Sequence, residues 1–390
     1  IQVDARRLHG RTASGQLVRD GEGARVAVVM EDGSIHSRPG RLLFTDLTVD
    51  PTTGQVALRA ERLGLAGLPL PLLPEMALVG AAFALLMLDL FLDNARRFIT
   101  HALALFVMVA VVWMLVTGVG GQDSVFSGMF VRDTLADVSK VVIVAVSALS
   151  LVYGWPYLRE RNLYPGEAPV LVMFATAGMM MMVSAGSLVM VYLGLELLAL
   201  CSYALVALNR DDGLATEAAM KYIVLSSLAS GLLLYGMSLV YGATGSIDLA
   251  TIAENAPMAA QPGMLLTGVA FMVAGIAFKF GAAPFHMWLP DVYHGAPTPI
   301  TLFIGSAPKL AAFAMAMRLL EVGMGPLAED WRPLLAMLAA LSLVVGNLFA
   351  LAQANLKRML AYSTVPHVGF LFMGMAGGVA PGYAAALLCA

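Results

Sequence analysis

The sequence predicts an all-α polytopic membrane protein of about ten to eleven transmembrane helices, preceded by a short β-rich polar N-terminal segment. Three observations support this prediction. Hydrophobic residues make up 59% of the chain and charged residues only 13%, with a mean hydropathy of +0.80, whereas soluble domains carry roughly 25% charged residues. Residues 1–62 hold 17 of the 49 formally charged side chains, so the remaining 328 residues are poor in charge. Long apolar segments recur throughout that remainder.

The polar segment, residues 1–62, alternates β-rich runs with turn signals from residue 17 to residue 61. The run 25–30 precedes an Asp-Gly turn signal, and residues 50–54 read Asp-Pro-Thr-Thr-Gly. This alternation predicts a β meander. Residues 17–61, most clearly 40–61, resemble the β-barrel region of the periplasmic adaptor proteins of efflux pumps. About 60 residues are too few to rebuild that barrel, so we expect a foreign or truncated fragment and assign it no function.

Residues 63–390 form the predicted transmembrane domain. Its apolar segments reach 18 or more residues, long enough to cross a hydrocarbon layer of ~30 Å as helices. They lie at about 72–92, 98–117, 134–154, 168–186, 188–208, 216–241, 263–283, 299–320, 333–353 and 359–379. An eleventh segment starts near residue 381, and we expect the fold to be incomplete at its C-terminal end.

The positive charges of the short loops predict the orientation, because cytoplasmic loops carry an excess of Lys and Arg. Alternate loops hold seven such residues on one side and three on the other. The seven are Arg96, Arg97, Arg159, Arg161, Arg210, Lys357 and Arg358, and the three are Arg132, Arg318 and Arg332. The first span is therefore expected to start outside the cytoplasm.

Four ionisable side chains within the predicted spans stand out: Glu196, Lys221, Lys279 and Lys309. Each costs at least ~2.5–3.5 kcal/mol at mid-depth and usually meets a partner or a water-filled path. Desolvation lowers the pKa of a lysine and raises that of a carboxyl group, whereas a nearby opposite charge does the reverse. A lysine that exchanges a carboxylate partner for another lysine therefore releases its proton more readily. The four residues predict a chain of sites that passes protons through the apolar layer.

Three of these residues also have a structural interpretation. Glu196 could be a protonated carboxyl group that is hydrogen-bonded between helices. Lys221 follows Glu217 by four residues, which is a favourable helical pair. Lys309 is the hardest to explain structurally, because no acidic residue lies within one turn of it.

The fourth residue, Lys279, could extend to the membrane surface. However, Gly281 and Pro284 follow it and indicate a discontinuous helix that lines protein or water. Two histidines beside prolines, His286 and His367, could relay protons between the sites or be ordinary polar groups.

Other classes of function are disfavoured. A net charge of −3 does not favour binding of nucleic acid. Cys201 and Cys389 are too isolated for a disulfide framework or a cysteine-ligated cluster. No nucleotide-binding loop and no haem or flavin ligand set is present, so we expect no redox centre in this chain. Asp133, Asp137 and Lys140 are spaced as one helical face, which we expect at a helix end facing water or a neighbouring subunit.

Four stretches carry a resemblance to a known family. They are residues 192–198 (YLGLELL), 217–227 (EAAMKYIVLSS), 279–297 (KFGAAPFHMWLPDVYHGAP) and 355–363 (NLKRMLAYS). They resemble the antiporter-like membrane subunits of bacterial NADH:quinone oxidoreductase (respiratory complex I), in particular the subunit N family, over about residues 68–390. The resemblance implies an inverted-repeat fold, with a first repeat at about 168–322 and a second, truncated repeat at about 333–390.

The resemblance also implies a function. In that family protons move along a polar axis, coupled to quinone reduction in other subunits. Glu196 would pair with a lysine of its repeat; the residues on or beside the axis would be Lys221, Lys279, Lys309, His286 and His367. Which lysine is the partner stays open. The implied partners are other membrane subunits, the lipid bilayer of a bacterial inner membrane and protons. NADH, flavin, iron–sulfur clusters and quinone would belong to partner subunits, with no cofactor or metal in this chain.

Two alternatives remain open. A subunit of a multi-subunit Na+/H+ antiporter or a membrane-bound hydrogenase would share these helices, although the Tyr-Leu-Gly-Leu-Glu form around Glu196 disfavours it. An efflux-associated component would require a complete adaptor sequence ahead of Ile1. The chain also departs from the family pattern, because its polar head is foreign to it and residue 390 precedes the second broken helix, which carries the outlet lysine.

Overall fold

The computed structural model describes residues 25–26, 40–49, 56–61, 70–93, 96–118, 123–161, 163 and 166–389. The chain divides into two compact units, Ile1–Leu73 and Pro74–Ala390. In the first unit, β1 (Arg25–Val26), β2 (Gly40–Val49) and β3 (Val56–Glu61) form an antiparallel sheet in the order β1-β2-β3. The turn signals at residues 31–33 and 50–54 lie outside the described residues.

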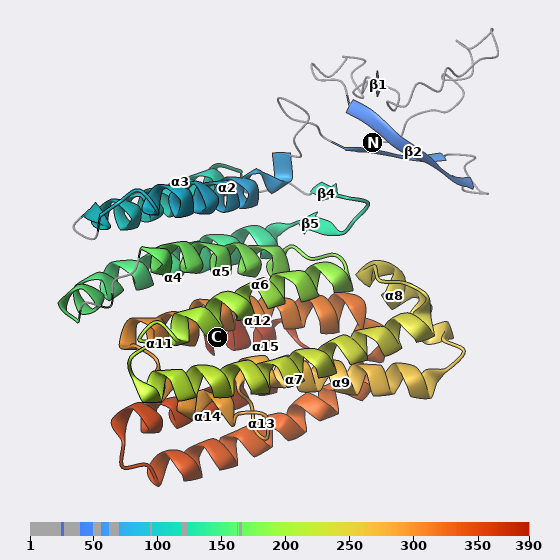
Figure 1. Ribbon diagram of the computed structural model, residues 1–390. Helices are drawn as coiled ribbons and strands as arrows, with labels where there is room; N and C mark the ends of the chain where they lie inside the picture. Colours follow the sequence, from blue (N-terminus) through green and yellow to red (C-terminus); the bar gives the residue numbers. More distant parts are fainter. Residues whose placement is uncertain are drawn as a thin grey trace. The chain divides into compact units, whose positions relative to one another are not determined.

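The second unit is built mainly of helices (Figure 1). They are α2 (Leu73–Asp89), α3 (Phe98–Gly118), α4 (Thr134–Glu160), α5 (Glu167–Val183), α6 (Leu188–Val206), α7 (Gly213–Thr244), α8 (Leu249–Asn255), α9 (Pro262–Phe280), α10 (Trp288–Gly295), α11 (Thr298–Gly305), α12 (Ala307–Ala316), the π-helix η5 (Met317–Gly323), α13 (Ala328–Leu351), α14 (Leu356–Ala376) and α15 (Ala380–Cys389). A short hairpin, β4 (Asp123–Val125) and β5 (Phe130–Arg132), connects α3 to α4.

Helical segments lie in each range in which the sequence predicts a span, with 299–320 divided among α11, α12 and η5. Among the described residues, eight helical segments are long and apolar enough to cross a membrane. The expectation of an all-α protein that spans the membrane several times is therefore confirmed.

Glycines set the spacing of two packed helix pairs, α5 with α6 and α7 with α9. A Cβ atom on Gly178 of α5 would lie 2.7 Å from the carbonyl oxygen of Gly194 on α6. A Cβ atom on Gly236 of α7 would likewise lie 2.7 Å from the carbonyl oxygen of Gly268 on α9. Small residues let membrane helices approach closely and gain packing where lipid supplies no hydrophobic drive. Both crossings therefore depend on the absence of side chains.

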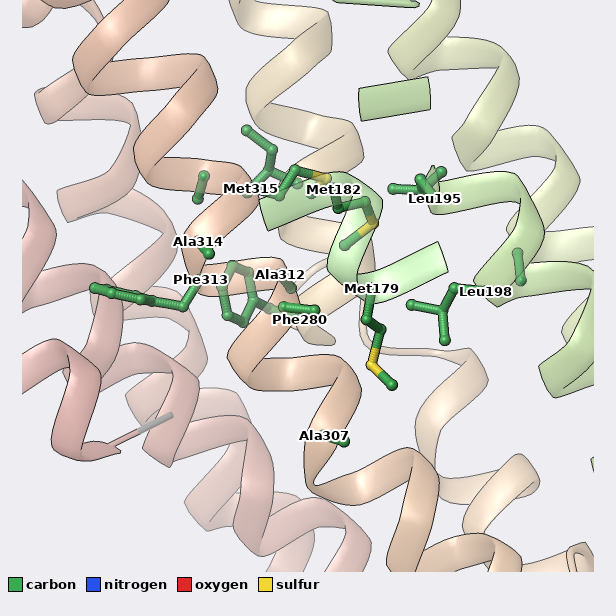
Figure 2. Close-up of a cluster of buried hydrophobic side chains, with 14 of the residues drawn as sticks. Met179, Met182, Leu195, Leu198, Phe280, Ala307, Ala312, Phe313, Ala314 and Met315 are labelled. Atoms are coloured by element: carbon green, nitrogen blue, oxygen red, sulfur yellow. The ribbon is translucent and has the colours of Figure 1, made fainter. Parts of the chain in front are cut away.

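Part of the core lies where α5, α6, the end of α9 and α12 meet. Figure 2 shows Met179 and Met182 of α5, Leu195 and Leu198 of α6, and Met315 of α12 gathered in this region. Two of the four consecutive methionines, Met179 and Met182, are buried here, which agrees with the use of flexible thioethers to fill irregular gaps.

Two helices of this core are interrupted. Helix α9 ends at Gly281, which has a φ of 77°, a left-handed conformation that glycine adopts without a steric cost. The break predicted from Gly281 and Pro284 is thus confirmed. A second interruption separates α11 from α12 at Ser306. Because Pro308 has no N–H group, the carbonyl of Ile304 has no α-helical donor there.

Candidate functional site

Lys279 lies in the last turn of α9, next to the last helical residue, Phe280. Its Nζ donates a hydrogen bond to the Oγ atom of Ser226 on α7 at 3.2 Å. A serine hydroxyl is neutral, so this contact orients the ammonium group and leaves its charge uncancelled. The end of α9 thus places the amine of Lys279 against α7.

Lys309 lies in the first turn of α12, directly after the second interruption. Its backbone N–H donates to the carbonyl of Ser306 at 3.0 Å, and the residue is half-buried. The ion pairs found in the described part of the chain do not include Lys309. A half-buried ammonium group without a counter-charge is stabilised by water or another polar group nearby.

Lys279 and Lys309 line the same cavity, although they are 30 residues apart in sequence. The cavity leaves about 30 Å³ for the centres of water molecules, whereas one water needs roughly 10–15 Å³ by that measure. It therefore has room for about two waters. Hydroxyl-bearing residues also line it, namely Ser202, Tyr222 and Tyr293. The two amines thus share a small space that water can occupy.

The rest of the cavity wall is apolar. Met182, Leu195, Leu198, Ala312 and Met315 line it, and Figure 2 shows these side chains on α5, α6 and α12. A wall of this kind excludes bulk water and leaves the two lysines as the charged groups of the cavity lining. Charges interact more strongly in such surroundings than in water.

Glu196 lies on α6 beside this cavity and does not line it. The residue is half-buried, and its Oε1 atom is buried without a hydrogen-bond partner among the described residues. Glu196 and Lys279 form no ion pair within 4.0 Å. A proton would therefore need a bridging water or a side-chain movement to pass between the carboxylate and the amine.

Lys221 belongs to a different cluster. It is exposed and pairs with Glu217 at 2.7 Å and with Asp291 of α10 at 2.9 Å. Arg358 of α14 contacts the other oxygen of the same aspartate at 2.6 Å. The expected helical pair with Glu217 is confirmed, and the structure does not bring Lys221 to the cavity shared by Lys279 and Lys309.

Asp291 was not among the candidates from sequence, although it lies inside the motif at 279–297. Partial burial would raise the pKa of its carboxyl group, but the hydrogen bonds from Lys221 and Arg358 lower it more, and the pKa lies below its ordinary value. Asp291 is thus an ionised anchor that joins α7, α10 and α14. Its partners come from positions 70 residues before and 67 residues after it, so helical spacing could not reveal them.

The two candidate histidines lie in different surroundings. His286 lies between α9 and α10, where its ring faces Tyr362 with centroids 6.0 Å apart. Its Nδ1 atom is buried and has no hydrogen-bond partner within the described ranges. His367 is exposed on α14, and its Nδ1 contacts the carbonyl of Ser363 in the same helix at 2.7 Å. Neither histidine lines the cavity of the two lysines.

A second group of charges is buried around the start of α4. Lys140 pairs with Glu75 of α2 at 2.6 Å, and Asp137 pairs with Arg132 at 3.1 Å. The expectation that this face meets water or a neighbouring subunit is wrong, because Asp137 and Lys140 are each 1% exposed. Their partners lie on other elements, so the helical spacing showed the charges but not where they point. In addition, Asp133 pairs with the buried Arg318 at 2.7 Å.

We find no group of three or more metal-ligating side chains in the parts of the chain that the structure describes. The arrangement around Lys279 and Lys309 is instead suited to holding and exchanging protons.

Comparisons with known proteins identify the family of the chain. Residues 185–389 match the family described as NADH:quinone oxidoreductase/Mrp antiporter, transmembrane. Residues 4–62 match a separate family, the β-barrel domain of RND membrane fusion proteins, which confirms the resemblance of the head to efflux-pump adaptors.

Two relatives are named NADH-quinone oxidoreductase subunit N. The protein from Xanthomonas euvesicatoria is 70% identical over 320 residues, covering 82% of this chain and 66% of the relative. The protein from Thioalkalivibrio sulfidiphilus is 49% identical over 322 residues, covering 82% and 67% respectively. The chain thus spans about two thirds of the length of these relatives.

A solved structure shows the same fold. A chain of respiratory complex I from Thermus thermophilus with bound aureothin superposes with a TM-score of 0.67 at 32% identity, covering 81% of this chain and 68% of that one. By its family match, its relatives and its fold, the chain belongs to the NADH:quinone oxidoreductase/Mrp antiporter membrane family, in the branch of subunit N.

Proposed function

We propose that the chain is a proton-translocating membrane subunit of an NADH:quinone oxidoreductase. One observation carries the proposal: two amines, Lys279 and Lys309, stand at helix interruptions and line one water-sized cavity inside an apolar bundle. Transmembrane lysines are costly and mark ion pathways. The relatives named subunit N support the assignment to this enzyme.

The proposed path runs from Glu196 through Lys279 to Lys309. When Glu196 is ionised it favours the charged form of Lys279, and when Glu196 is neutralised that support is lost. A proton then moves through the cavity water toward Lys309. Quinone reduction in partner subunits supplies the energy, and NADH, flavin, iron–sulfur clusters and quinone belong to those subunits, with no redox centre here.

In this proposal the other candidate residues lie outside the path from Glu196 to Lys309. Lys221, held by Asp291, lies at the exposed end of α7 and exchanges protons with the surface. His286 lies beside the interruption after α9 and connects toward α14. We place His367 beside the path rather than on it, because it is exposed on α14 and does not line the cavity.

The membrane arrangement is part of the same proposal. We propose ten to eleven spans in a bacterial inner membrane, with the first span starting on the periplasmic side, as the loop charges indicate. The helices from α5 to η5 would form the first of two inverted repeats, and α13 would open the second. Other membrane subunits of the complex would be the partners.

The test uses the full-length subunit within its complex, reconstituted in sealed vesicles. Lys279→Ala and Glu196→Ala should each depress proton pumping and coupled quinone reduction together, because both remove a group from the path. Arg210→Ala is the matched control, since it removes an exposed charge that pairs only loosely with Glu167 at 3.7 Å. Normal pumping by both path variants would refute the assignment.

A second candidate function is a subunit of a Na+/H+ antiporter or a membrane-bound hydrogenase. The family description itself favours keeping it, because it names Mrp antiporters together with the oxidoreductase. Sodium-dependent proton movement that persists without NADH or quinone in the same vesicles would establish this alternative and overturn the first.

A further inference from the structure

Tyr293 is a lining residue of the lysine cavity to which the path above assigns no role. It lies on α10, is only 6% exposed, and lines the cavity together with Lys279 and Lys309. Its hydroxyl oxygen is buried and has no hydrogen-bond partner among the described residues. Buried polar groups in native proteins are nearly always paired with protein or ordered water, so the cavity is where this hydroxyl finds its partner.

The hydroxyl lies against the helix interruption that precedes Lys309. A Cβ atom on Gly305 would stand 3.3 Å from the Tyr293 oxygen, so a glycine there leaves room for it. One residue earlier, the Ile304 carbonyl has no helical donor because Pro308 follows four residues later. Ile304 and Pro308 line the same cavity. The hydroxyl thus lies where the helical hydrogen-bond pattern is broken between α11 and α12.

Other contacts hold α10 in this place. The Nε1 of Trp288 donates to the Phe278 carbonyl at the end of α9 at 2.9 Å, and its ring stacks on Tyr222 with centroids 5.0 Å apart. The Tyr293 carbonyl accepts a hydrogen bond from Thr301 Oγ1 at 3.3 Å. The ring of Tyr293 is therefore held between the two interruptions by groups other than its own hydroxyl, and the hydroxyl is not needed to position it.

We propose that the Tyr293 hydroxyl is a relay group between Lys279 and Lys309, acting through the water of their cavity; this rests on the function proposed above. A cavity water takes a proton from the Lys279 ammonium group as it passes one of its own to the hydroxyl oxygen, and the hydroxyl's proton passes to the neutral Lys309 amine, directly or through a second cavity water. The tyrosine is neutral before and after, and rotation about the C–O bond restores its starting orientation. No oxidant or second reactant is required.

The test compares Tyr293→Phe with Tyr235→Phe in the complex that contains the full-length subunit, reconstituted in sealed vesicles. Both changes remove one hydroxyl, but Tyr235 is exposed on α7 against Phe271 and lies outside the cavity. We expect Tyr293→Phe to lower the rate of proton pumping roughly 2- to 10-fold, the range that corresponds to one hydrogen bond. Tyr235→Phe should leave it unchanged.

Stability separates a relay from a structural role. The Tyr293 hydroxyl has no protein partner among the described residues and would bond only to cavity water, so its removal should leave the thermal stability of the complex nearly unchanged. A slower pump of unchanged stability supports the relay. Normal pumping by Tyr293→Phe, with Lys279→Ala impaired, overturns the relay and leaves the proposed function standing. Normal pumping by both variants overturns both.

A second measurement covers a variant that fails to assemble. A high-resolution map of the unaltered complex should show ordered water within hydrogen-bond distance, about 3.2 Å, of the Tyr293 oxygen. The absence of ordered water around the Tyr293 oxygen in that map overturns the relay.

Discussion

The buried pair of Glu75 on α2 and Lys140 on α4 gives a sharp test of how this bundle tolerates charge. The perturbation is Lys140→Met, which keeps a long apolar side chain and removes the amine. Lys140 is 1% exposed, Glu75 is 4% exposed, and their charged atoms lie 2.6 Å apart. The Lys140 amine also lies 4.7 Å from the centroid of the Phe130 ring.

The magnitude follows from these contacts. At 2.6 Å, two unit charges attract by about 6 kcal/mol at an effective dielectric constant of about 20. Most of that attraction offsets the cost of burying both charges, so the pair contributes little net stability. Removing only Lys140 leaves the Glu75 carboxylate unpaired, and we expect a loss of about 3–5 kcal/mol. Removing both charges with Glu75→Leu and Lys140→Met should come within about 1–2 kcal/mol of the unaltered protein.

The assay is a double-mutant cycle measured by reversible unfolding of the full-length subunit in mixed detergent micelles. The cycle isolates the pair energy, because each single change strands one partner and the double change strands neither. A loss below about 1 kcal/mol for Lys140→Met would refute the reasoning. A double variant as unstable as the sum of the two single variants would refute it as well.

Two further predictions test the helix packing and the anchor on α10. Gly178→Val should destabilise the subunit by about 1–3 kcal/mol, because its Cβ atom would lie 2.7 Å from a backbone oxygen of α6. The control is Gly213→Ala, since Gly213 has open space around it. Equal stability of the two variants in detergent unfolding would contradict the close crossing of α5 and α6. Lys221 and Arg358 lower the pKa of Asp291 in the folded state. The ionised carboxylate therefore stabilises the folded protein at pH values above its unfolded pKa of about 3.9. This stabilisation is lost as the pH falls through the lower pKa of the folded state. Asp291→Asn should therefore flatten the acid limb of the stability profile between about pH 5 and 2, and an unchanged acid limb would show that other groups control it.

Several features of the molecule follow from local sequence. The apolar segments and the scarcity of charge beyond residue 62 predict the membrane-spanning helices, because only helices satisfy the backbone over such lengths in lipid. Gly281 and Pro284 predict the end of α9 from backbone sterics alone. The pair of Glu217 and Lys221 follows from helical spacing.

The grouping of charges needed the tertiary structure. Lys279, Lys309 and Lys221 look alike in sequence, as amines within apolar runs, yet the first two share a cavity and the third lies in an exposed cluster with Asp291. Asp137 also looked like a surface residue and is 1% exposed. Helical periodicity relates only residues three or four positions apart.

By itself, the sequence determined the class of the protein, the positions of its helices and the identities of the ionisable groups within them, because each depends on composition and near-neighbour geometry. Only the tertiary structure decided which of those groups meet. The contacts that matter, such as Lys279 with Ser226 or Arg318 with Asp133, join residues 53 and 185 positions apart. Such contacts arise from how whole helices pack, which no local pattern encodes.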